Sequence, residues 1–367
     1  MKIETIGSPR VIMENSRSKH NYFAWPSAVR LQNGRIAVGA SGFRLAHVCP
    51  FGKTVLSYSE DEGESYTAPA AVIDTVLDDR DCGLTVFGEK GLIVTSFNNT
   101  VEFQRTGNSF FGKKDGAAEN EYCQRYLDLI TPEEEARNLG TTFRISRDCG
   151  VTFGPIFHSP ISSPHGPVEL RDGTILWVGR IHNGYDSFRI GRDFVEAHTI
   201  NSETGEMTFR GRIETIYEDG KQLLSCEPHA IELPDGRILC HIRVQEQGYF
   251  TLYQSESVDG GYTWSKPRAI LDKTGGAPSH LMLHSSGVLI AVYGYRNSPY
   301  GIRCIMSTDL GDTWSEPQVI SDGYPNGDLG YPMTVELKDG SLITVYYAHE
   351  DAEGPAMIWQ QKWKLVD

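Results

Sequence analysis

The 367-residue chain has few cysteines and no long apolar run. Its 7 cysteines are scattered along the sequence and include no Cys-x-x-Cys pair, which argues against a disulfide scaffold and against a structural zinc site. No stretch resembles a membrane-spanning helix, which needs about 20 consecutive apolar residues. We therefore expect a globular protein with free thiols, as in a reducing compartment, and we predict no metal site and no cofactor.

Basic residues are also in short supply. The chain has 34 Lys and Arg against 48 Asp and Glu, a formal net charge of −14. This balance disfavours nucleic acid and anionic membrane surfaces as partners, and an acidic substrate would require a local cluster of arginines. Residues 1–7 contain no apolar signal-peptide core. We expect either a cytoplasmic protein or a secreted or periplasmic one whose leader has been removed.

A short pattern of the form Ser-x-Asp-x-Gly-x-(Thr/Ser)-aromatic recurs along the chain. Its aspartate can accept hydrogen bonds from main-chain amides of its own turn, its glycine supplies a positive φ angle, and its aromatic ring packs on the adjoining sheet. The pattern therefore predicts tight hairpins, and we interpret its aspartates as structural rather than catalytic. The four copies occupy residues 59–66, 146–153, 257–264 and 307–314, and a degraded copy occupies 201–208.

A second repeat is a ten-residue frame that ends in glycine and precedes an apolar run. Each unit predicts a strand, a tight turn and a second strand. Six such hairpins, most of them followed by a hairpin of the first kind, predict an all-β, six-bladed β-propeller with four-stranded antiparallel blades, in a single domain spanning 1–367. Segments 11–13 and 359–365 would share a blade and close the ring. The frames occupy 25–34, 82–91, 164–173, 227–236, 278–287 and 331–340.

One interval, approximately 98–140, breaks this rhythm. Its centre, 119–130, has helical composition, and Thr131 followed by Pro132 is typical of a helix start. Insertions of this length are usually functional. We predict a partly helical insertion that forms a pocket wall or the surface of a homodimer, with a passive decoration as the alternative.

Equivalent positions of equivalent blades lie on a ring around the propeller axis. The start of the frame carries Glu227 and Tyr331, and Asp81 directly precedes the second frame. Histidines occupy the second and third frame positions. A strand that begins near the axis for structural reasons alone would need small or apolar residues, so these residues predict a polar, titratable pocket. The histidines are His165, His229 and His280; they come from separate blades, and we do not assign them a metal.

Arginines form a second set of repeat-related positions. Arg180 and Arg243 both follow their frame glycine by seven residues, Arg44 and Arg296 come slightly later, and Arg303 precedes the last Asp-containing box. Guanidinium groups that face one cavity suit a carboxylate. We predict an anion site, with solvated or paired arginines as the alternative.

With both repeats in view, nearly the whole chain resembles the sialidase (neuraminidase) superfamily of six-bladed propellers. Segment 225–229 through Arg243 is similar to the family segment with a Glu and a carboxylate-binding Arg. Segment 330–332 with 345–347 is similar to the one with the nucleophilic Tyr. The resemblance implies a retaining mechanism in which Tyr331 is the nucleophile and Glu227 its base. It also implies a carboxylate-binding role for Arg303, for which Arg296 competes.

The sequence departs from the family pattern at two positions, one for carboxylate binding and one for the catalytic acid. Ala24 stands where the family has an arginine, and loop 45–58 contains no acid. His47 is the titratable candidate there besides Cys49. Asp81 or Asp79 could serve as the acid through mutual repulsion with neighbouring carboxylates, and a histidine near neutrality could also serve.

The leading hypothesis is an exo-acting glycoside hydrolase that cleaves a terminal sialic acid or a related acidic sugar. Its predicted site contains Tyr331, Glu227, Asp81 and His47 as catalytic groups, and it binds a glycan through the arginines together with His165 and His229. The alternatives are another propeller glycosidase or a lyase that uses His47 or His165 as acid and base, and a glycan-binding propeller without catalysis.

Overall fold

The protein forms a ring of six antiparallel sheets, as the repeats predict. The computed structural model describes residues 1–182, 194–246, 249–271 and 278–366. The first blade consists of β2 (Tyr22–Arg30), β3 (Ile36–Arg44), β4 (Lys53–Ser59) and β5 (Ala70–Ile73). The second consists of β6 (Arg80–Phe87), β7 (Gly91–Phe97), β8 (Thr141–Ser146) and β9 (Phe157–Ser159). In the third, the short strands β10 (Ile161–Ser162) and β11 (Val168–Glu169) both pair with β12 (Ile175–Ile181), which is followed by β13 (Val195–Ile200) and β14 (Met207–Ile213).

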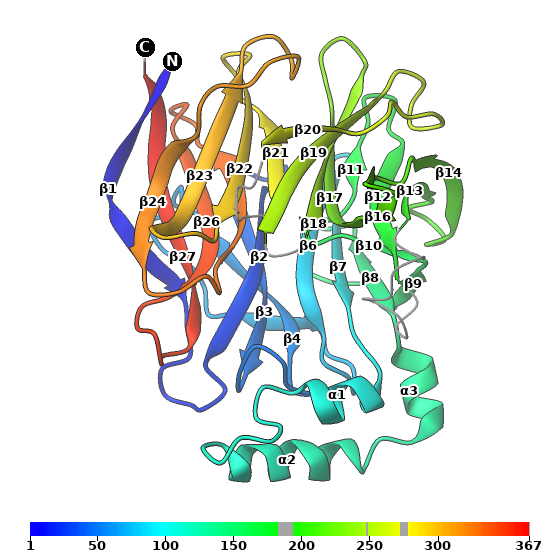
Figure 1. Cartoon of the computed structure of the whole chain (residues 1–367), viewed down its shortest axis with the longest axis vertical. Helices are drawn as coiled ribbons and strands as arrows, with labels where there is room; N and C mark the ends of the chain where they lie inside the picture. The colour runs from blue at the N-terminus through cyan, green and yellow to red at the C-terminus, as the bar shows by residue number, and fades with distance from the viewer. Residues whose placement is uncertain (183–193, 247–248, 272–277, 367) are drawn as a thin grey trace.

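The other three blades repeat the four-stranded pattern (Figure 1). The hairpin β15 (Tyr217–Glu218) and β16 (Lys221–Gln222) lies before the fourth blade, which has β17 (Leu224–Glu232), β18 (Ile238–Glu246), β19 (Tyr249–Ser257) and β20 (Arg268–Leu271). The fifth has β21 (Ser279–Leu283), β22 (Leu289–Tyr295), β23 (Tyr300–Ser307) and β24 (Gln318–Tyr324). The sixth has β25 (Gly330–Glu336), β26 (Leu342–His349), β27 (Ala356–Val366) and β1 (Lys2–Met13).

The sixth blade closes the ring with both ends of the chain. The N-terminal β1 is the outermost strand and pairs with the C-terminal β27, with Val11 opposite Trp359. The two termini consequently lie side by side (Figure 1). This confirms the predicted shared blade. The innermost strand of each blade remains a sheet edge, but in the closed ring these edges face the axis and are protected from edge-to-edge association.

The hydrophobic core lies between neighbouring blades. One cluster combines Ile290 and Ile302 of the fifth blade with Leu342, Tyr346 and Trp363 of the sixth. Strands that are buried on both faces explain why the apolar runs after the frame glycines are continuous instead of alternating. Each blade is therefore stabilised mainly by its two neighbours.

The Asp-containing boxes connect the third and fourth strands of their blades, away from the axis. In the box of the fourth blade, Asp259 accepts hydrogen bonds from the Thr263 amide at 2.9 Å and from its hydroxyl at 2.6 Å, and Ser257 Oγ accepts from the Gly261 amide. These bonds lower the pKa of Asp259 to about 2. Segment 201–208 occupies the same place in the third blade, where Asn201 Oδ1 accepts from the Glu203 and Thr204 amides, much as the box serine Ser257 accepts from the amides of its own turn. The boxes are structural, as the sequence indicated.

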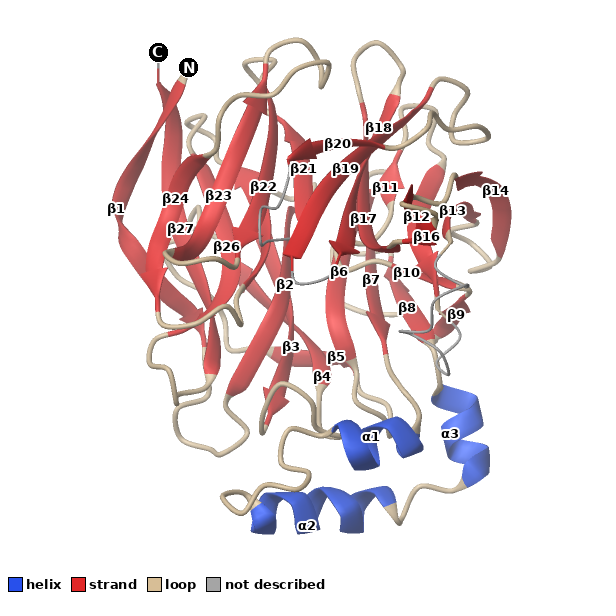
Figure 2. Ribbon diagram, in the orientation of Figure 1, coloured by secondary structure: helices blue, strands red, loops and turns tan. Residues whose placement is uncertain are grey.

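The insertion between β7 and β8 forms α1 (Val101–Gly107), α2 (Ala117–Leu127) and α3 (Pro132–Asn138). Thr131 caps α3 in a capping box with Glu134. Figure 2 shows the helices together at the end of the molecule opposite the termini. None of the helices in the described part of the chain is long and apolar enough to cross a membrane.

Candidate active site

The innermost strands of four blades are interrupted at the same place by a β-bulge. The ladder shifts register around Trp25, Asp81, Glu227 and Tyr331. These four residues have φ angles of 53°, 48°, 50° and 50°. A left-handed conformation costs a residue other than glycine about 1–3 kcal/mol, and a bulge re-aims the side chain that it carries. All four side chains line one cavity of about 280 Å³ at the axis.

The second blade departs from the alignment that the sequence suggested. The frame placed Cys82 in the ring position, whereas the structure places Asp81 there and buries Cys82 fully. The reason is that Gly91, used to align the frame, pairs with Phe87 across the turn, as Arg35 does with Leu31 in the first blade, and so stands one position after the place of the frame glycine Gly34. The frame aligned on Gly91 therefore starts one residue too late on the inner strand.

Tyr331 and Glu227 are in direct contact across the axis, from the sixth and fourth blades. Tyr331 Oη donates a 2.5 Å hydrogen bond to Glu227 Oε1, and Arg243 Nη1 bonds Glu227 Oε2 at 2.5 Å and lies 3.4 Å from Tyr331 Oη. Burial, reinforced by the Glu227 carboxylate, raises the pKa of Tyr331 well above its usual value. The resting site therefore has a protonated phenol with a carboxylate already placed to accept its proton.

Four arginines line the cavity, and one of them was missed by the sequence analysis. Arg180, Arg243 and Arg296 were predicted there; Arg80, from the start of β6, was not. The Arg80 guanidinium lies 4.2 Å from the Trp25 ring, where a cation–π contact holds it, and donates to the His47 carbonyl at 3.0 Å. Arg80 does not belong to either repeat. It directly precedes Asp81, the bulge residue of its strand, and this neighbourhood is the signal that could have identified it.

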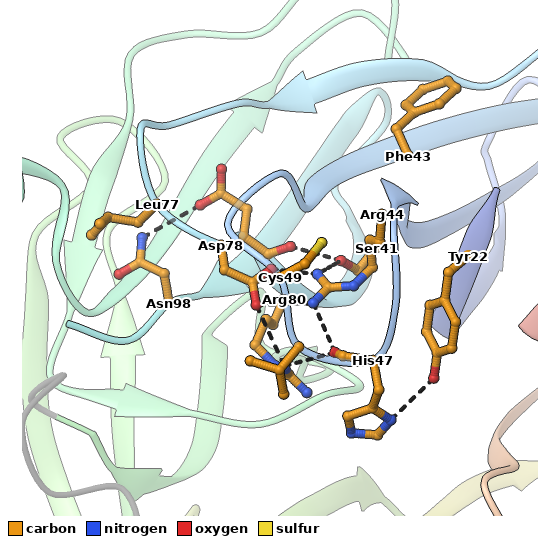
Figure 3. Close-up of polar contacts among 12 residues, drawn as sticks. Tyr22, Ser41, Phe43, Arg44, His47, Cys49, Leu77, Asp78, Arg80 and Asn98 are labelled. Carbon is orange, nitrogen blue, oxygen red and sulfur yellow. Dashed lines mark hydrogen bonds and ion pairs between the residues drawn. The ribbon is translucent and has the colours of Figure 1, made fainter. Parts of the chain in front are cut away.

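The structure places the other two predicted arginines away from the cavity. Arg44 is fully buried, and its two terminal nitrogens bond the Asp78 carboxylate at 2.5 and 2.9 Å (Figure 3). It also donates to Ser41 Oγ, to the His47 carbonyl and, through Nε, to the Ala46 carbonyl, so all five N–H donors are used within the protein. Arg303, on β23, donates to the Pro299 carbonyl and is not among the residues that line the cavity. We therefore exclude Arg44 and Arg303 from the anion site and retain Arg296.

The structure also distinguishes the two candidates for the catalytic acid, Asp81 and Asp79. Asp81 faces the cavity, and burial together with the nearby Glu227 raises its pKa to about 7. Burial also raises the pKa of Asp79 to about 7, but this carboxylate accepts from the Thr75 amide at 2.6 Å and from its hydroxyl at 2.9 Å, outside the cavity. Asp81 is the aspartate that can reach a ligand.

His47 lies in the cavity wall, and a residue without any sequence signal holds it. Its Nδ1 atom is 3.1 Å from Asp328 Oδ1 and 3.0 Å from Tyr22 Oη (Figure 3 shows the contact with Tyr22). Asp328 lies in the connection between β24 and β25, where no repeat and no motif marks it. This partner of His47 could not have been identified from the sequence.

The histidines His165, His229 and His280 converge on the axis but do not line the cavity. Their ring centroids are 4.8 to 5.6 Å apart, and burial lowers the pKa of each, that of His165 to about 3. His229 accepts from the Leu281 amide, so it is a neutral packing group. The expected roles of His165 and His229 in binding a substrate are not supported by this placement. No group of three His, Cys, Asp or Glu side chains that could hold a metal exists among the described residues.

The insertion supplies one wall of the cavity. Asn99 and Phe103 line it together with Phe97 at the end of β7. Hydrogen bonds from Asn98 to the Asn138 carbonyl and from the Gly140 amide back to Asn98 tie the two ends of the insertion together. The pocket-wall interpretation therefore agrees with the structure, and the homodimer surface stays a prediction.

A family model described as a BNR repeat-like domain matches residues 126–345, more than half of the chain. The chain belongs to this family. A comparison with curated protein sequences found no match. The family assignment and the blade architecture confirm the predicted sialidase-like propeller.

Solved structures share the propeller of this BNR repeat-like protein. A protein of unknown function from Dyadobacter fermentans is 18% identical, with both chains covered completely and a TM-score of 0.75. The NanB sialidase from Streptococcus pneumoniae is 12% identical, with 97% of this chain and 70% of that chain covered and a TM-score of 0.67. The sialidase from Trypanosoma rangeli, in complex with the inhibitor DANA, is 14% identical over 98% of this chain and 59% of that one, with a TM-score of 0.62. At these identities the likeness establishes the fold.

Proposed function

We propose that the protein is an exo-acting glycoside hydrolase that releases a terminal sialic acid or a related acidic sugar by a retaining mechanism. The observation that carries this proposal is the contact of Tyr331 with Glu227 beside Arg243, at the centre of a cavity lined by arginines. The volume of about 280 Å³ is near the lower limit for ligand pockets and suits one sugar unit.

In the first step, Tyr331 Oη attacks the anomeric carbon while its proton passes to Glu227 Oε1. A phenol is a weak nucleophile unless a base is adjacent, and Glu227 meets this requirement at 2.5 Å. An uncharged nucleophile also avoids repulsion by the carboxylate of an acidic sugar, and this is why sialidases use Tyr where most glycosidases use a carboxylate. Arg243 stabilises Glu227 before it takes the proton.

Recognition of the acidic group falls to the arginines of the cavity. Arg296 donates with Nε and Nη2 to the Leu329 carbonyl and with Nη2 to Tyr347 Oη, so its position is fixed before a ligand arrives. Arg80 is fixed in the same way on the Trp25 ring. A planar, preorganised guanidinium loses little entropy when it binds a carboxylate. This low entropic cost and the local positive charge favour binding of an anionic ligand despite the negative net charge of the protein.

Asp81 is our candidate for the acid that protonates the leaving group. With a pKa of about 7, a large fraction of this carboxyl group is protonated at neutral pH. We expect kcat/KM to be high below pH 7 and to fall as the pH rises through about 7, because the acid form is then lost. In Asp81→Asn this decline should vanish, and kcat should fall by about 100-fold for a sugar leaving group but less for an aryl one.

Asp79→Asn is the matched control for this pH profile, because Asp79 has a similarly raised pKa but lies outside the cavity. A profile that shifts in Asp79→Asn and stays unchanged in Asp81→Asn would contradict the assignment.

The function itself is tested by the release of the fluorophore from a fluorogenic sialoside, followed by identification of the sugar product. The panel should include glycosides of other acidic sugars and a uronate-containing glycan. Turnover of an acidic-sugar glycoside with retained anomeric configuration supports the proposal. Elimination to an unsaturated uronate would instead support the lyase alternative with His47, and binding without turnover of any member would support the non-catalytic alternative.

A further inference from the structure

Asp328 is the centre of a hydrogen-bond cluster in the wall of the cavity. Its carboxylate accepts from Tyr22 Oη and from Tyr347 Oη, both at 2.8 Å, and lies 3.1 Å from a ring nitrogen of His47 and of His349. Two of these partners, His47 and Tyr347, line the cavity. The cluster joins the first blade to the sixth, next to the nucleophile.

The hydrogen bonds determine which nitrogen of His47 carries the proton. Hydrogen bonds from His349 and His47 hold the pKa of Asp328 well below its usual value despite burial, so the carboxylate is ionised and can only accept. Nδ1 of His47 must then be the donor, to Asp328 and to a lone pair of Tyr22 Oη, whose own proton goes to Asp328 Oδ2. In the neutral ring this leaves the lone pair on Nε2, and the side chain of His47 is 42% exposed.

We propose that Asp328 is a positioning residue that fixes His47 as the Nδ1–H tautomer, so that Nε2 accepts a proton from the water that releases the sugar from Tyr331. This inference rests on the proposed function, which it extends to the second half of the reaction. It gives His47 and Asp81 separate tasks: Asp81 donates to the leaving group in the first step, and His47 accepts in the second.

Groups of the site and solvent account for every proton that moves in the second step. Water forms a bond to the anomeric carbon as its proton passes to His47 Nε2, and the bond between that carbon and Tyr331 Oη breaks. The departing phenolate takes back from Glu227 the proton that it gave up in the first step, across the 2.5 Å hydrogen bond. His47 then loses its proton and Asp81 regains one by exchange with solvent.

The charged and titratable groups around His47 favour the neutral ring that this role requires. Its main-chain carbonyl accepts from Arg44 of β3 and Arg80 of β6, while Asp328 and Tyr22 face the ring. Partial desolvation of the ring and the two arginines lower the pKa of His47, and Asp328 opposes this effect without reversing it. His47 is therefore neutral and can act as a base at neutral pH, in the way of a histidine that a neighbouring carboxylate orients.

His349 provides an internal comparison. It also contacts Asp328, from β26, but its other nitrogen is hydrogen-bonded to the Gly354 carbonyl at 2.7 Å. Both ring nitrogens are thus occupied, and His349 does not line the cavity. A change at His349 removes one partner of Asp328 without touching the base.

The test is Asp328→Asn, with His349→Gln as the matched control. An amide at position 328 can donate to Nδ1 and so move the proton of His47 to Nε2. We expect kcat to fall by about 100-fold to 10⁴-fold with KM changed by less than about threefold, whereas His349→Gln stays within about threefold of the unchanged protein. Because the second step is the one affected, the fluorogenic substrate should give a burst, and the glycosyl adduct on Tyr331 should accumulate in the mass spectrum.

Rescue by azide distinguishes a variant that has lost only its base from one whose active site is damaged. It attacks the anomeric carbon without giving up a proton, so it should restore turnover in Asp328→Asn and in His47→Gln. A variant that loses the burst along with steady-state turnover, or that azide does not rescue, would overturn the inference. A large rise of KM without a fall in kcat would also overturn the inference. It would mean that Asp328 supports substrate binding, through Tyr347 and Arg296.

The tautomer can be measured without any substrate. Ring ¹⁵N shifts of His47 in the free protein should indicate the Nδ1–H form in the unchanged protein and in His349→Gln, and a different form in Asp328→Asn. Unchanged shifts in Asp328→Asn overturn the positioning role even if the enzyme is active. Failure of every acidic-sugar glycoside to turn over would instead refute the proposed function, and the proposed second step with it, whatever the tautomer.

Discussion

Tyr331→Phe is expected to reduce kcat by about 10³-fold or more, because it removes the oxygen that would form the glycosyl intermediate. The substitution deletes one hydroxyl group and leaves the ion pair of Glu227 with Arg243 in place. We therefore expect little change in the binding of a substrate analogue. Steady-state kinetics with the fluorogenic sialoside measure the first effect, and calorimetric titration with an unreactive sialoside measures the second.

Tyr66→Phe is the matched control for this substitution. Tyr66 also donates one hydroxyl hydrogen bond, to Gln360 Oε1 at 2.8 Å, but it belongs to an Asp-containing box on the outer part of the first blade. Its loss should leave kcat unchanged. If Tyr331→Phe retained more than about a tenth of kcat, Tyr331 could not be the nucleophile. Circular dichroism and the melting temperature of both variants establish that they are folded.

Asp78→Ala is expected to lower the free energy of unfolding by about 3–5 kcal/mol, since it leaves the Arg44 guanidinium charged and unpaired in the interior. The side chains of Arg44 and Asp78 are 0% and 1% exposed and form two hydrogen bonds to each other. Removing one partner of such a pair costs far more than the pair contributes, because the remaining charge has lost its solvation. Urea unfolding followed by fluorescence measures the change.

Asp74→Ala, in the same blade, is the control for this second prediction. Asp74 pairs with Lys53 at the surface, where the two side chains are 49% and 35% exposed. Solvent screens such pairs, so the expected change is within about 1 kcal/mol. Equal effects of the two substitutions would contradict our account of the buried pair.

The same buried pair has a consequence for the site. Arg44 donates to the main-chain carbonyl of His47, and Arg80 donates to the same atom. Arg44 was predicted to bind substrate, and the structure assigns it instead to the support of the loop that carries His47. The position of the first blade that matches Arg243 is held by Ser41, opposite Ala24, and the burial of Arg44 against Asp78 removes it from the cavity.

The parts of the protein that the sequence determined are those that depend on short-range rules. Aspartate, glycine and an aromatic residue at fixed spacing specify a box within a few residues, and Thr131 with Pro132 specifies the start of α3 in the same way. Six repetitions then favour one architecture, a closed ring in which every blade packs against two neighbours. The fold, the closure of the ring and the place of the insertion followed from this local information.

The site was only partly determined in this way, because the residues that face the axis depend on the register of the inner strands. A shift of one residue exchanges Cys82 for Asp81, and bulges decide that Glu227 and Tyr331 point inward. Asp328 lies in a connecting loop without a repeat, and only the packing of the first blade against the sixth brings it to His47. Tertiary structure decided these contacts because they join residues far apart in the chain, 281 positions for His47 and Asp328 and 104 for Glu227 and Tyr331, and no local rule of sequence acts over such separations.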